Sequence, residues 1–246
     1  MIPLGPREVH IHWVREDRVT DPALLAEYEA MLSPEEKARL PRFLLDWARH
    51  QFLLTRALAR TTLSRYVEAA PEAWTFEPGP HGRPEIRAPQ TRLCFNLTNT
   101  RGFVACAVAW DREIGVDVED TDRPRAGLEV ADRFFSPLEV AGLRATPEAM
   151  QRERFFAYWT LKESYIKARS MGLALPLWQF SFHLPEDVAA CRPTRISFDP
   201  ALDDDPASWQ FELWRPTERH MVSLAIRRRG EPDLPVTLRE VVPLGP

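Results

Sequence analysis

The sequence predicts an α+β protein made of two halves that meet near residue 111. Residues 10–110 contain a short strand pattern, then helical patterns and then strand patterns. From residue 113 onward the pattern is a strand, then helices, then further strands, as expected of two α+β halves. The chain of 246 residues has room for one or two domains of roughly 150 residues each. Its 23 prolines and many aromatic residues argue against a simple helical bundle. We therefore expect an N-terminal α+β half at residues 1–111 and a C-terminal α+β half with a tail at residues 112–246.

The N-terminal half shows both helical and strand periodicity. Strict alternation predicts a strand, apolar residues at the helical period predict a helix, and Ser33 followed by Pro34 and two glutamates signals a helix start. Glycine and proline clusters predict turns. In order, we expect a strand at 10–14, helices at 21–31, from 33 onward and within 47–69, a turn or loop at 78–84, and strands at 92–97 and 103–110 joined by a turn at 99–102.

The C-terminal half begins with a strand and then turns helical. Ser136-Pro137-Leu138-Glu139 resembles a capped helix start, and Ser170-Met171-Gly172 is a typical helix end. The acidic triplet Asp203-Asp204-Asp205 beside a proline is most simply a solvated turn. In order, we expect a strand at 113–120, helical segments at 128–145, a long helix at 148–169, and strands at 180–184, 195–198, 209–214 and 221–226.

The composition excludes several classes of protein. A net charge of -4 should repel nucleic acid and anionic membranes. No apolar run approaches the ~18 residues of a membrane span, and the N-terminus lacks the pattern of a signal peptide. The three cysteines, Cys94, Cys106 and Cys191, have no metal-site or CxxC spacing, which favours a reduced cytoplasmic protein.

Lysine is scarce in this chain. Only Lys37, Lys162 and Lys167 occur among 32 basic residues, which is explained most simply by a genome-level preference for arginine codons. Two of the three nevertheless lie within six residues of each other. Because lysine, unlike arginine, can give up its proton in a protein, this pair is a candidate for chemistry.

Two carboxylates share one face of the strand expected at 113–120. Ile114, Val116 and Val118 should face one way, and Asp117 and Glu119 the other, roughly 7 Å apart on an open face. Like charges at that distance are unfavourable unless a cation or water separates them, and oxygen ligands favour Mg²⁺ or Ca²⁺. An exposed strand face with two ordinary acids is the alternative.

The long helix carries a second set of polar residues. Trp159, Glu163 and Lys167 are spaced by four and form one stripe. They could be a surface pair, but apolar residues surround the helix, and such a helix is mostly buried, so its charges need partners. A divalent cation would satisfy the glutamate and an anionic ligand the lysine. Strand and helix together suggest a site that handles phosphate through a metal ion.

Other features indicate less. Gly82-Arg83-Pro84 could contact a phosphate or be only a turn, and Arg39, Arg42 and Arg49 could form an anion site or a solvated basic face. The motifs GxxxxGK[ST], GxGxxG and GxSxG are absent, which removes the usual nucleotide-fold and α/β-hydrolase interpretations.

Taken in order, these segments resemble the Sfp-type (surfactin-type) 4′-phosphopantetheinyl transferases. The resemblance spans about residues 32–228, and the pairing of G-[IV]-D-[IV]-E with W-x-x-K-E-x-x-x-K is highly specific. It implies a pseudo-dimer of two similar α+β halves with the active site in the cleft between them. The matching blocks are Gly82-Arg83-Pro84, Phe95 to Thr100, Ile114 to Glu119 and Trp159 to Lys167, with further family-like segments at 134–139 and 172–177.

The resemblance also implies an activity and assigns residues to it. Mg²⁺-dependent transfer of the phosphopantetheine arm of coenzyme A to a serine of an acyl or peptidyl carrier protein would release adenosine 3′,5′-bisphosphate. Glu163 would help to deprotonate the serine, and Lys167 would neutralise or protonate the leaving phosphate. The role of Glu139, which matches a family acid near the metal, stays open. The expected metal ligands are Asp117, Glu119 and Glu163, and the expected coenzyme A contacts are Arg39, Arg49, Arg83, Thr98, Asn99 and Lys162.

One residue departs from the family pattern. Asn99 stands where members usually have a histidine that contacts a coenzyme A phosphate, and asparagine carries no charge. The change should weaken that contact by very roughly 1 kcal/mol unless Arg101 supplies the charge. Asn99 supports one alternative, a degenerate homologue that binds coenzyme A or a carrier without transfer. A second alternative, an unrelated Mg²⁺-dependent phosphohydrolase, leaves the ordered blocks unexplained. A monomer is expected, since a covalent pseudo-dimer needs no self-association.

Overall fold

The computed structural model describes residues 1–79, 81–123, 128–185 and 195–245, which form two compact units. The first comprises residues 1–112 and 235–246, and the second residues 113–234. Both contain helices and β-sheet, so the α+β class is confirmed. The C-terminal tail, however, belongs to the first unit and not to the C-terminal half where the sequence analysis placed it.

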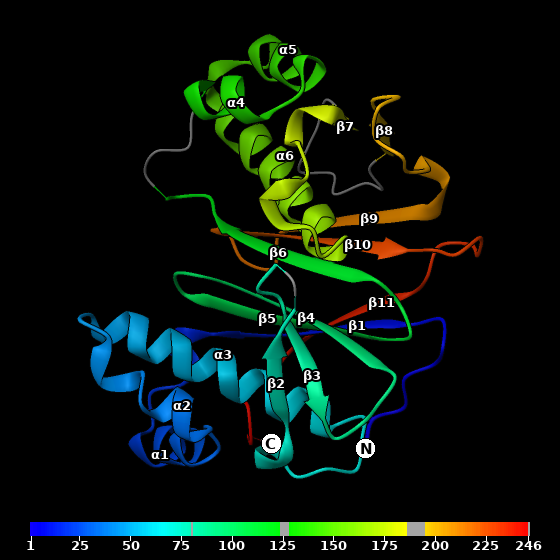
Figure 1. Cartoon of the computed structure of the whole chain (residues 1–246). Helices are drawn as coiled ribbons and strands as arrows, with labels where there is room; N and C mark the ends of the chain where they lie inside the picture. Colours follow the sequence, from blue (N-terminus) through cyan, green and yellow to red (C-terminus); the bar gives the residue numbers. More distant parts are fainter. Residues whose placement is uncertain (80, 124–127, 186–194, 246) are drawn as a thin grey trace. The chain divides into compact units, whose positions relative to one another are not determined.

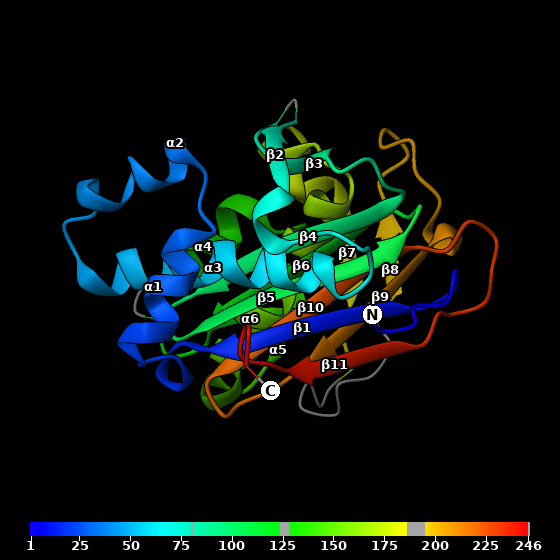
Figure 2. The same ribbon diagram turned by 90° about the horizontal axis from the view of Figure 1, so that it is seen from below.

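Within the described residues of the first unit, four strands form a sheet in the order β11–β1–β5–β4. Figure 2 shows β11 beside β1, and this pair is parallel, whereas β1–β5 and β5–β4 are antiparallel. Helix α3 packs on the sheet, and its apolar residues build the core with those of β1, β4 and β5. The elements are β1 (Val9–Arg15), η1 (Glu16–Arg18), α1 (Pro22–Ala30), α2 (Pro34–Lys37), η2 (Leu40–Arg42), α3 (Asp46–Ser64), η3 (Pro71–Ala73), β2 (Thr75–Pro78), β3 (Pro84–Ala88), β4 (Leu93–Thr100), β5 (Phe103–Trp110) and β11 (Val236–Glu240).

In the described part of the second unit, β6, β10 and β9 form an antiparallel sheet against which α6 packs (Figure 1). Aromatic residues of α6, β7 and β9 fill the core. The elements are β6 (Ile114–Asp120), α4 (Leu128–Phe134), α5 (Pro137–Ala145), α6 (Glu148–Ala168), η4 (Gly172–Ala174), η5 (Leu177–Gln179), β7 (Phe180–His183), β8 (Arg195–Phe198), η7 (Pro206–Ser208), β9 (Trp209–Trp214) and β10 (His220–Arg227).

Most expected elements are present, with three differences. The turn expected at 78–84 is flanked by two strands, β2 and β3, that were not expected, β4 extends to Thr100, and β11 was not expected. The capping signals at Ser33 and Ser136 are confirmed, since both hydroxyls accept from the backbone three residues on.

No helix in the described ranges combines the length and apolar character needed to cross a bilayer. Cys94 and Cys106 are free thiols, and Cys191 lies outside the described residues.

Candidate functional site

Strand β6 lies unusually close to helix α6 at Gly115. A Cβ atom built on Gly115 would come within 2.1 Å of the Ser164 carbonyl oxygen and 2.4 Å of the Ala168 backbone nitrogen. Glycine is therefore required by a close backbone approach. Because side chains alternate along a strand, Asp117 and Glu119 point to the same side as the missing Cβ.

The carboxylate face of β6 is thus the face that α6 covers. The sequence analysis expected an open face there, but Asp117 and Glu119 are both buried. The expectation of an open face was wrong because strand periodicity shows which residues share a face but not which segment covers that face. The consequence is that the acidic pair of β6 lies against the helix that carries Glu163 and Lys167.

Lys167 joins the two elements directly. Its ammonium lies 2.6 Å from Asp117 Oδ1 and donates to the Val116 carbonyl oxygen at 3.2 Å. The Lys167 side chain remains about one quarter exposed (28%), whereas that of Asp117 is 7% exposed. The ion pair is therefore sheltered on its acidic side and can still be reached from its basic side.

The pKa values of Glu119 and Glu163 are both raised at this site. Burial and the charge of Asp117 together raise the pKa of Glu163 to about 7, against the opposing effects of Lys167 and Arg123. Burial likewise raises the pKa of Glu119, with Asp117 again adding to the effect. Three carboxylates that make each other's charge unfavourable form a set that a cation would stabilise.

The donor chemistry fits a hard divalent cation, because all three candidate ligands are carboxylates. In the residues described, however, no three Asp, Glu, His or Cys side chains are grouped closely enough to hold a metal ion together. Asp117 is engaged instead by Lys167. The site therefore fits a divalent cation in the type of its donor atoms and in the repulsion between its carboxylates, which a cation would relieve.

Arg123 was missed by the sequence analysis. Its guanidinium lies 3.1 Å from Glu119 Oε2, four residues away along the chain. A cation just after an acidic strand was the signal that could have identified it. Arg123 is half-exposed, and its positive charge opposes the rise in the pKa of Glu119.

Lys162 is a buried lysine of α6 that is enclosed by acceptor groups. Its side chain is 1% exposed, and its ammonium contacts Glu139 Oε2 at 2.8 Å and donates to the carbonyl oxygens of Leu177 and Phe180 at 2.6 and 2.7 Å. The contact with coenzyme A expected for Lys162 therefore finds no support in its surroundings, which assign it a structural role. A helix stripe gives the direction of a side chain but not the segments packed over it.

Glu139, whose role was left open, is the partner that neutralises Lys162. Its Oε1 accepts from the Phe182 backbone nitrogen at 2.9 Å, and its Oε2 accepts from the Ser136 nitrogen at 3.0 Å. The carboxylate is completely buried. It thereby joins α5, α6 and β7 in one polar centre.

The first unit contains a pocket of about 1050 Å³. Arg39 and Asn99 both line it, together with Gly82 and Pro84 on either side of Arg83. Arg56 and Arg60 also line it, and both pair with Glu36, at 3.2 and 2.6 Å. The pocket is rich in guanidinium groups, which suit an anionic ligand.

The other expected coenzyme A contacts do not line this pocket among the residues described. Arg49 is exposed and lies 3.4 Å from Glu29, Arg83 donates to the Phe95 carbonyl oxygen at 2.7 Å, and Thr98 is buried in β4. The basic face expected from Arg39, Arg42 and Arg49 is divided as well, because Arg39 precedes η2 and Arg49 lies in α3.

Comparison with known proteins gives consistent matches. A model of the 4'-phosphopantetheinyl transferase superfamily matches residues 113–225, which contain β6 and α6. The chain is similar to 4'-phosphopantetheinyl transferase HetI of Nostoc sp., with 32% identity over 226 residues, 91% of this chain and 89% of that protein. It is similar to 4'-phosphopantetheinyl transferase Sfp of Bacillus subtilis, with 33% identity over 178 residues, 72% of this chain and 77% of that protein. The crystal structure of Thermotoga maritima holo-[acyl-carrier-protein] synthase is similar over 47% of this chain and 62% of that one, with 18% identity and a TM-score of 0.37.

Proposed function

The chain belongs to the 4'-phosphopantetheinyl transferase superfamily, and from this premise we propose that it transfers the 4′-phosphopantetheine arm of coenzyme A to a serine of an apo carrier protein. The family and the enzyme class expected from the sequence are confirmed by these relatives. The serine oxygen would form a bond to the β-phosphorus of coenzyme A, the pyrophosphate P–O bond would break, and its electron pair would leave on adenosine 3′,5′-bisphosphate.

The observation that carries the proposal is the meeting of β6 and α6, which brings Asp117, Glu119, Glu163 and Lys167 to one place. We propose that Asp117, Glu119 and Glu163 hold Mg²⁺ once Lys167 has released Asp117 and the three carboxylates have moved together. Bound there, Mg²⁺ would neutralise the charge that develops on the pyrophosphate. The chain's own groups would position the serine and move its proton.

Glu163 is the proposed general base. In the metal-free site burial and Asp117 raise the pKa of Glu163 to about 7, and a carboxylate held beside the serine has the acceptor oxygens that general-base catalysis needs. Glu163 would take the serine proton directly or through a water. Lys167, still partly exposed, would neutralise or protonate the leaving phosphate, and its release from Asp117 would free that carboxylate.

The pocket of the first unit is the proposed site for the adenosine end of coenzyme A with its 3′-phosphate, whereas the pyrophosphate would lie at the proposed metal site. Arg39 supports this, because its guanidinium lies over the Phe52 ring at 4.9 Å and both residues line the pocket. Asn99 offers a neutral hydrogen bond in the same pocket. Arg101 lies over the Trp47 ring at 5.9 Å, and Trp47 lines the pocket, so Arg101 remains our candidate for the missing charge.

Several parts of the proposal rest on the resemblance and the composition alone. They are a pseudo-dimer with the active site in the cleft between similar halves, a monomeric state, a cytoplasmic location, the absence of a nucleic-acid partner, and a carrier belonging to a fatty acid, polyketide or nonribosomal peptide synthase. The alternative supported by Asn99 is a homologue that binds coenzyme A or a carrier without transfer. The family match removes the unrelated phosphohydrolase.

Intact mass spectrometry tests the proposal. An apo acyl or peptidyl carrier protein incubated with the chain, coenzyme A and Mg²⁺ should gain the mass of one phosphopantetheine group. The gain should disappear when coenzyme A is omitted or when a chelator removes the metal. Several carriers that all stay unmodified, while coenzyme A still binds, would support the alternative and make Asn99→His the first reversion.

A further inference from the structure

Asp204 is a buried carboxylate in a segment expected to be a solvated turn. Its side chain is 2% exposed, whereas its neighbours Asp203 and Asp205 are exposed. A buried charge is tolerated only when it is paired and hydrogen-bonded. The segment between β8 and β9 therefore turns Asp204 inward, where its carboxylate must be paired with cations and hydrogen-bond donors.

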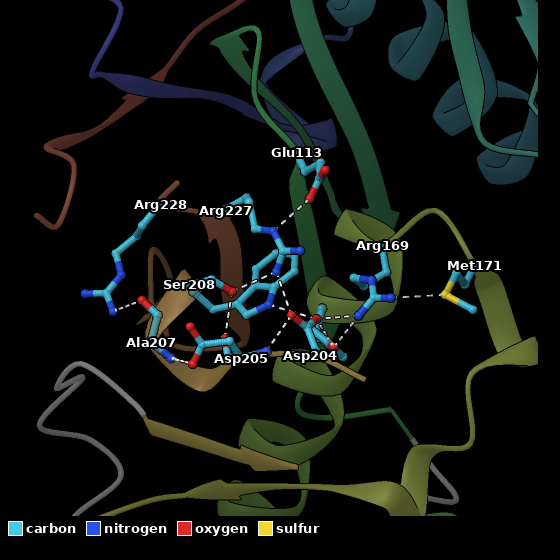
Figure 3. A network of polar contacts seen from close by, with 11 residues as sticks. Glu113, Arg169, Met171, Asp204, Asp205, Ala207, Ser208, Arg227 and Arg228 are labelled. Atoms are coloured by element: carbon cyan, nitrogen blue, oxygen red, sulfur yellow. Dashed lines mark hydrogen bonds and ion pairs between the residues drawn. The ribbon is translucent and has the colours of Figure 1, made fainter. Parts of the chain in front are cut away.

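Asp204 is bound by groups from three separate elements of the second unit (Figure 3). Two guanidinium groups, a phenol and an indole converge on one carboxylate. Burial raises the pKa of Asp204, but the hydrogen bonds from Arg227, Tyr165 and Trp209 outweigh it and hold the pKa at about 2. Its partners are Arg169 Nη1, Arg227 Nη1 at 2.6 Å, Tyr165 Oη at 2.7 Å, Trp209 Nε1 at 3.0 Å and the Asp205 backbone nitrogen at 2.8 Å.

Two of these partners belong to the end of α6. Tyr165 lies in its last turn, Arg169 follows it four residues later, and the two therefore share one face of the helix. Arg169 Nη1 also donates to Tyr165 Oη at 3.0 Å. Asp204 thus fastens this face of the helix end to Trp209 of β9 and Arg227 of β10.

Lys167 projects from the opposite face of the same turn. At 100° per residue it lies about 200° around the helix from Tyr165. There its ammonium contacts Val116 and Asp117 of β6. The last turn of α6 is consequently held on one side by Asp204 and on the other by the proposed catalytic contact.

The anchor is supported by further contacts. Arg227 Nε lies 3.3 Å from Glu113, and Arg227 Nη1 donates to Ser208 Oγ at 2.7 Å. Asp204 is the acceptor that Arg227 shares with Arg169. Neutralising this carboxylate would remove the common counter-ion of two cations and weaken the tie between helix and sheet.

We propose that Asp204 is a positioning residue for phosphopantetheine transfer, which rests on the proposed function. By fixing the rotation of the last turn of α6, it aims Lys167 and Glu163 at the acids of β6. Asp204 touches neither substrate nor metal in this scheme. Its effect should therefore appear in the rate of the chemical step and not in the binding of coenzyme A.

The test compares full-length Asp204→Asn with the matched control Asp203→Asn, which changes the exposed neighbour in the same way. We expect kcat per folded molecule to fall about tenfold or more in Asp204→Asn, since a displacement near 1 Å can cost about 10²-fold. The KM for coenzyme A should stay unchanged. Hydrogen exchange should quicken in the peptide that contains residues 165–169. The control should match the wild type in all three.

Tyr165→Phe removes one bond to Asp204 and keeps every charge, so it provides a milder variant if Asp204→Asn does not fold. A smaller fall in kcat with unchanged KM is expected. Wild-type kcat per folded molecule in these variants, with only the melting temperature lowered, would refute the positioning role. A wild-type chain that modifies no carrier would overturn the proposed function itself, and with it any role of Asp204 in transfer.

Discussion

The close approach of β6 and α6 makes Gly115 the most sensitive position in the described site. In Gly115→Ala the new methyl group would lie 2.1 Å from the Ser164 carbonyl oxygen, 2.4 Å from the Ala168 nitrogen and 3.0 Å from the Lys167 carbonyl carbon. All three are backbone atoms of the helix that carries Glu163 and Lys167. No side-chain rotation can relieve the contact, so the strand and the helix must separate.

The size of the effect follows from these distances. A carbon and a carbonyl oxygen in contact lie about 3.3–3.6 Å apart, so the elements must part by about 1.2 Å or more. Overpacking of this kind costs about 1–3 kcal/mol and occasionally more. A displacement near 1 Å at a catalytic site costs about 10²-fold in rate. Gly115→Ala should therefore lose both stability and nearly all transfer activity.

Urea unfolding and carrier modification followed by intact mass measure the two effects. Gly142→Ala in α5 is the matched control, because its methyl group would meet only the Tyr158 hydroxyl, at 3.0 Å, and alanine favours the helix by about 1 kcal/mol. The control should keep its stability and its activity. If Gly115→Ala unfolds at the wild-type urea concentration and transfers at the wild-type rate, the close approach does not align the site.

Three further predictions concern the charged groups. Lys162→Met should lower the free energy of unfolding by about 3–5 kcal/mol in urea titrations, because it leaves Glu139 as an uncompensated buried charge. The double variant Lys162→Met/Glu139→Gln should regain part of that stability, and a double variant no more stable than Lys162→Met would contradict this. Arg39→Ala should raise the KM for coenzyme A about tenfold through loss of a charge-assisted contact, whereas Arg49→Ala should not. The depressed pKa of Asp204 stabilises the fold above pH ~4, and this stabilisation is lost as pH falls towards about 2. In acid titration the free energy of unfolding should therefore fall more steeply with pH for the wild type than for Asp204→Asn. Equal slopes for the two proteins would refute the ionised, hydrogen-bonded state of Asp204.

The sequence was most informative where local pattern and chemistry coincide. Strand β6 and helix α6 follow from alternation and from the helical period, and the spacing of Glu163 and Lys167 places both on one side of the helix. The hairpin of β2 and β3 and the return of β11 to pair with β1 were not predicted. A parallel partner from the far end of the chain leaves no local signal in either strand.

The errors at the site have a common physical cause, which is that burial depends on segments distant in sequence. The family resemblance implied that Lys162 contacts a phosphate, but the Leu177 and Phe180 carbonyl groups and Glu139 close around it. Asp204 was expected in water because two acids flank it, but Arg169 and Arg227 draw it inward. Spacing predicts which face a residue occupies, and only the tertiary structure shows what it meets there.

The most direct test of the whole account is carrier modification by Glu163→Gln and by Glu148→Gln, an exposed change on the same helix, each beside the wild type. The account predicts that the wild type and Glu148→Gln add one phosphopantetheine group in the presence of coenzyme A and Mg²⁺. Glu163→Gln, folded but without its proposed base and metal ligand, should be slower by about 10²-fold or more. Modification by Glu163→Gln at the wild-type rate would contradict the account.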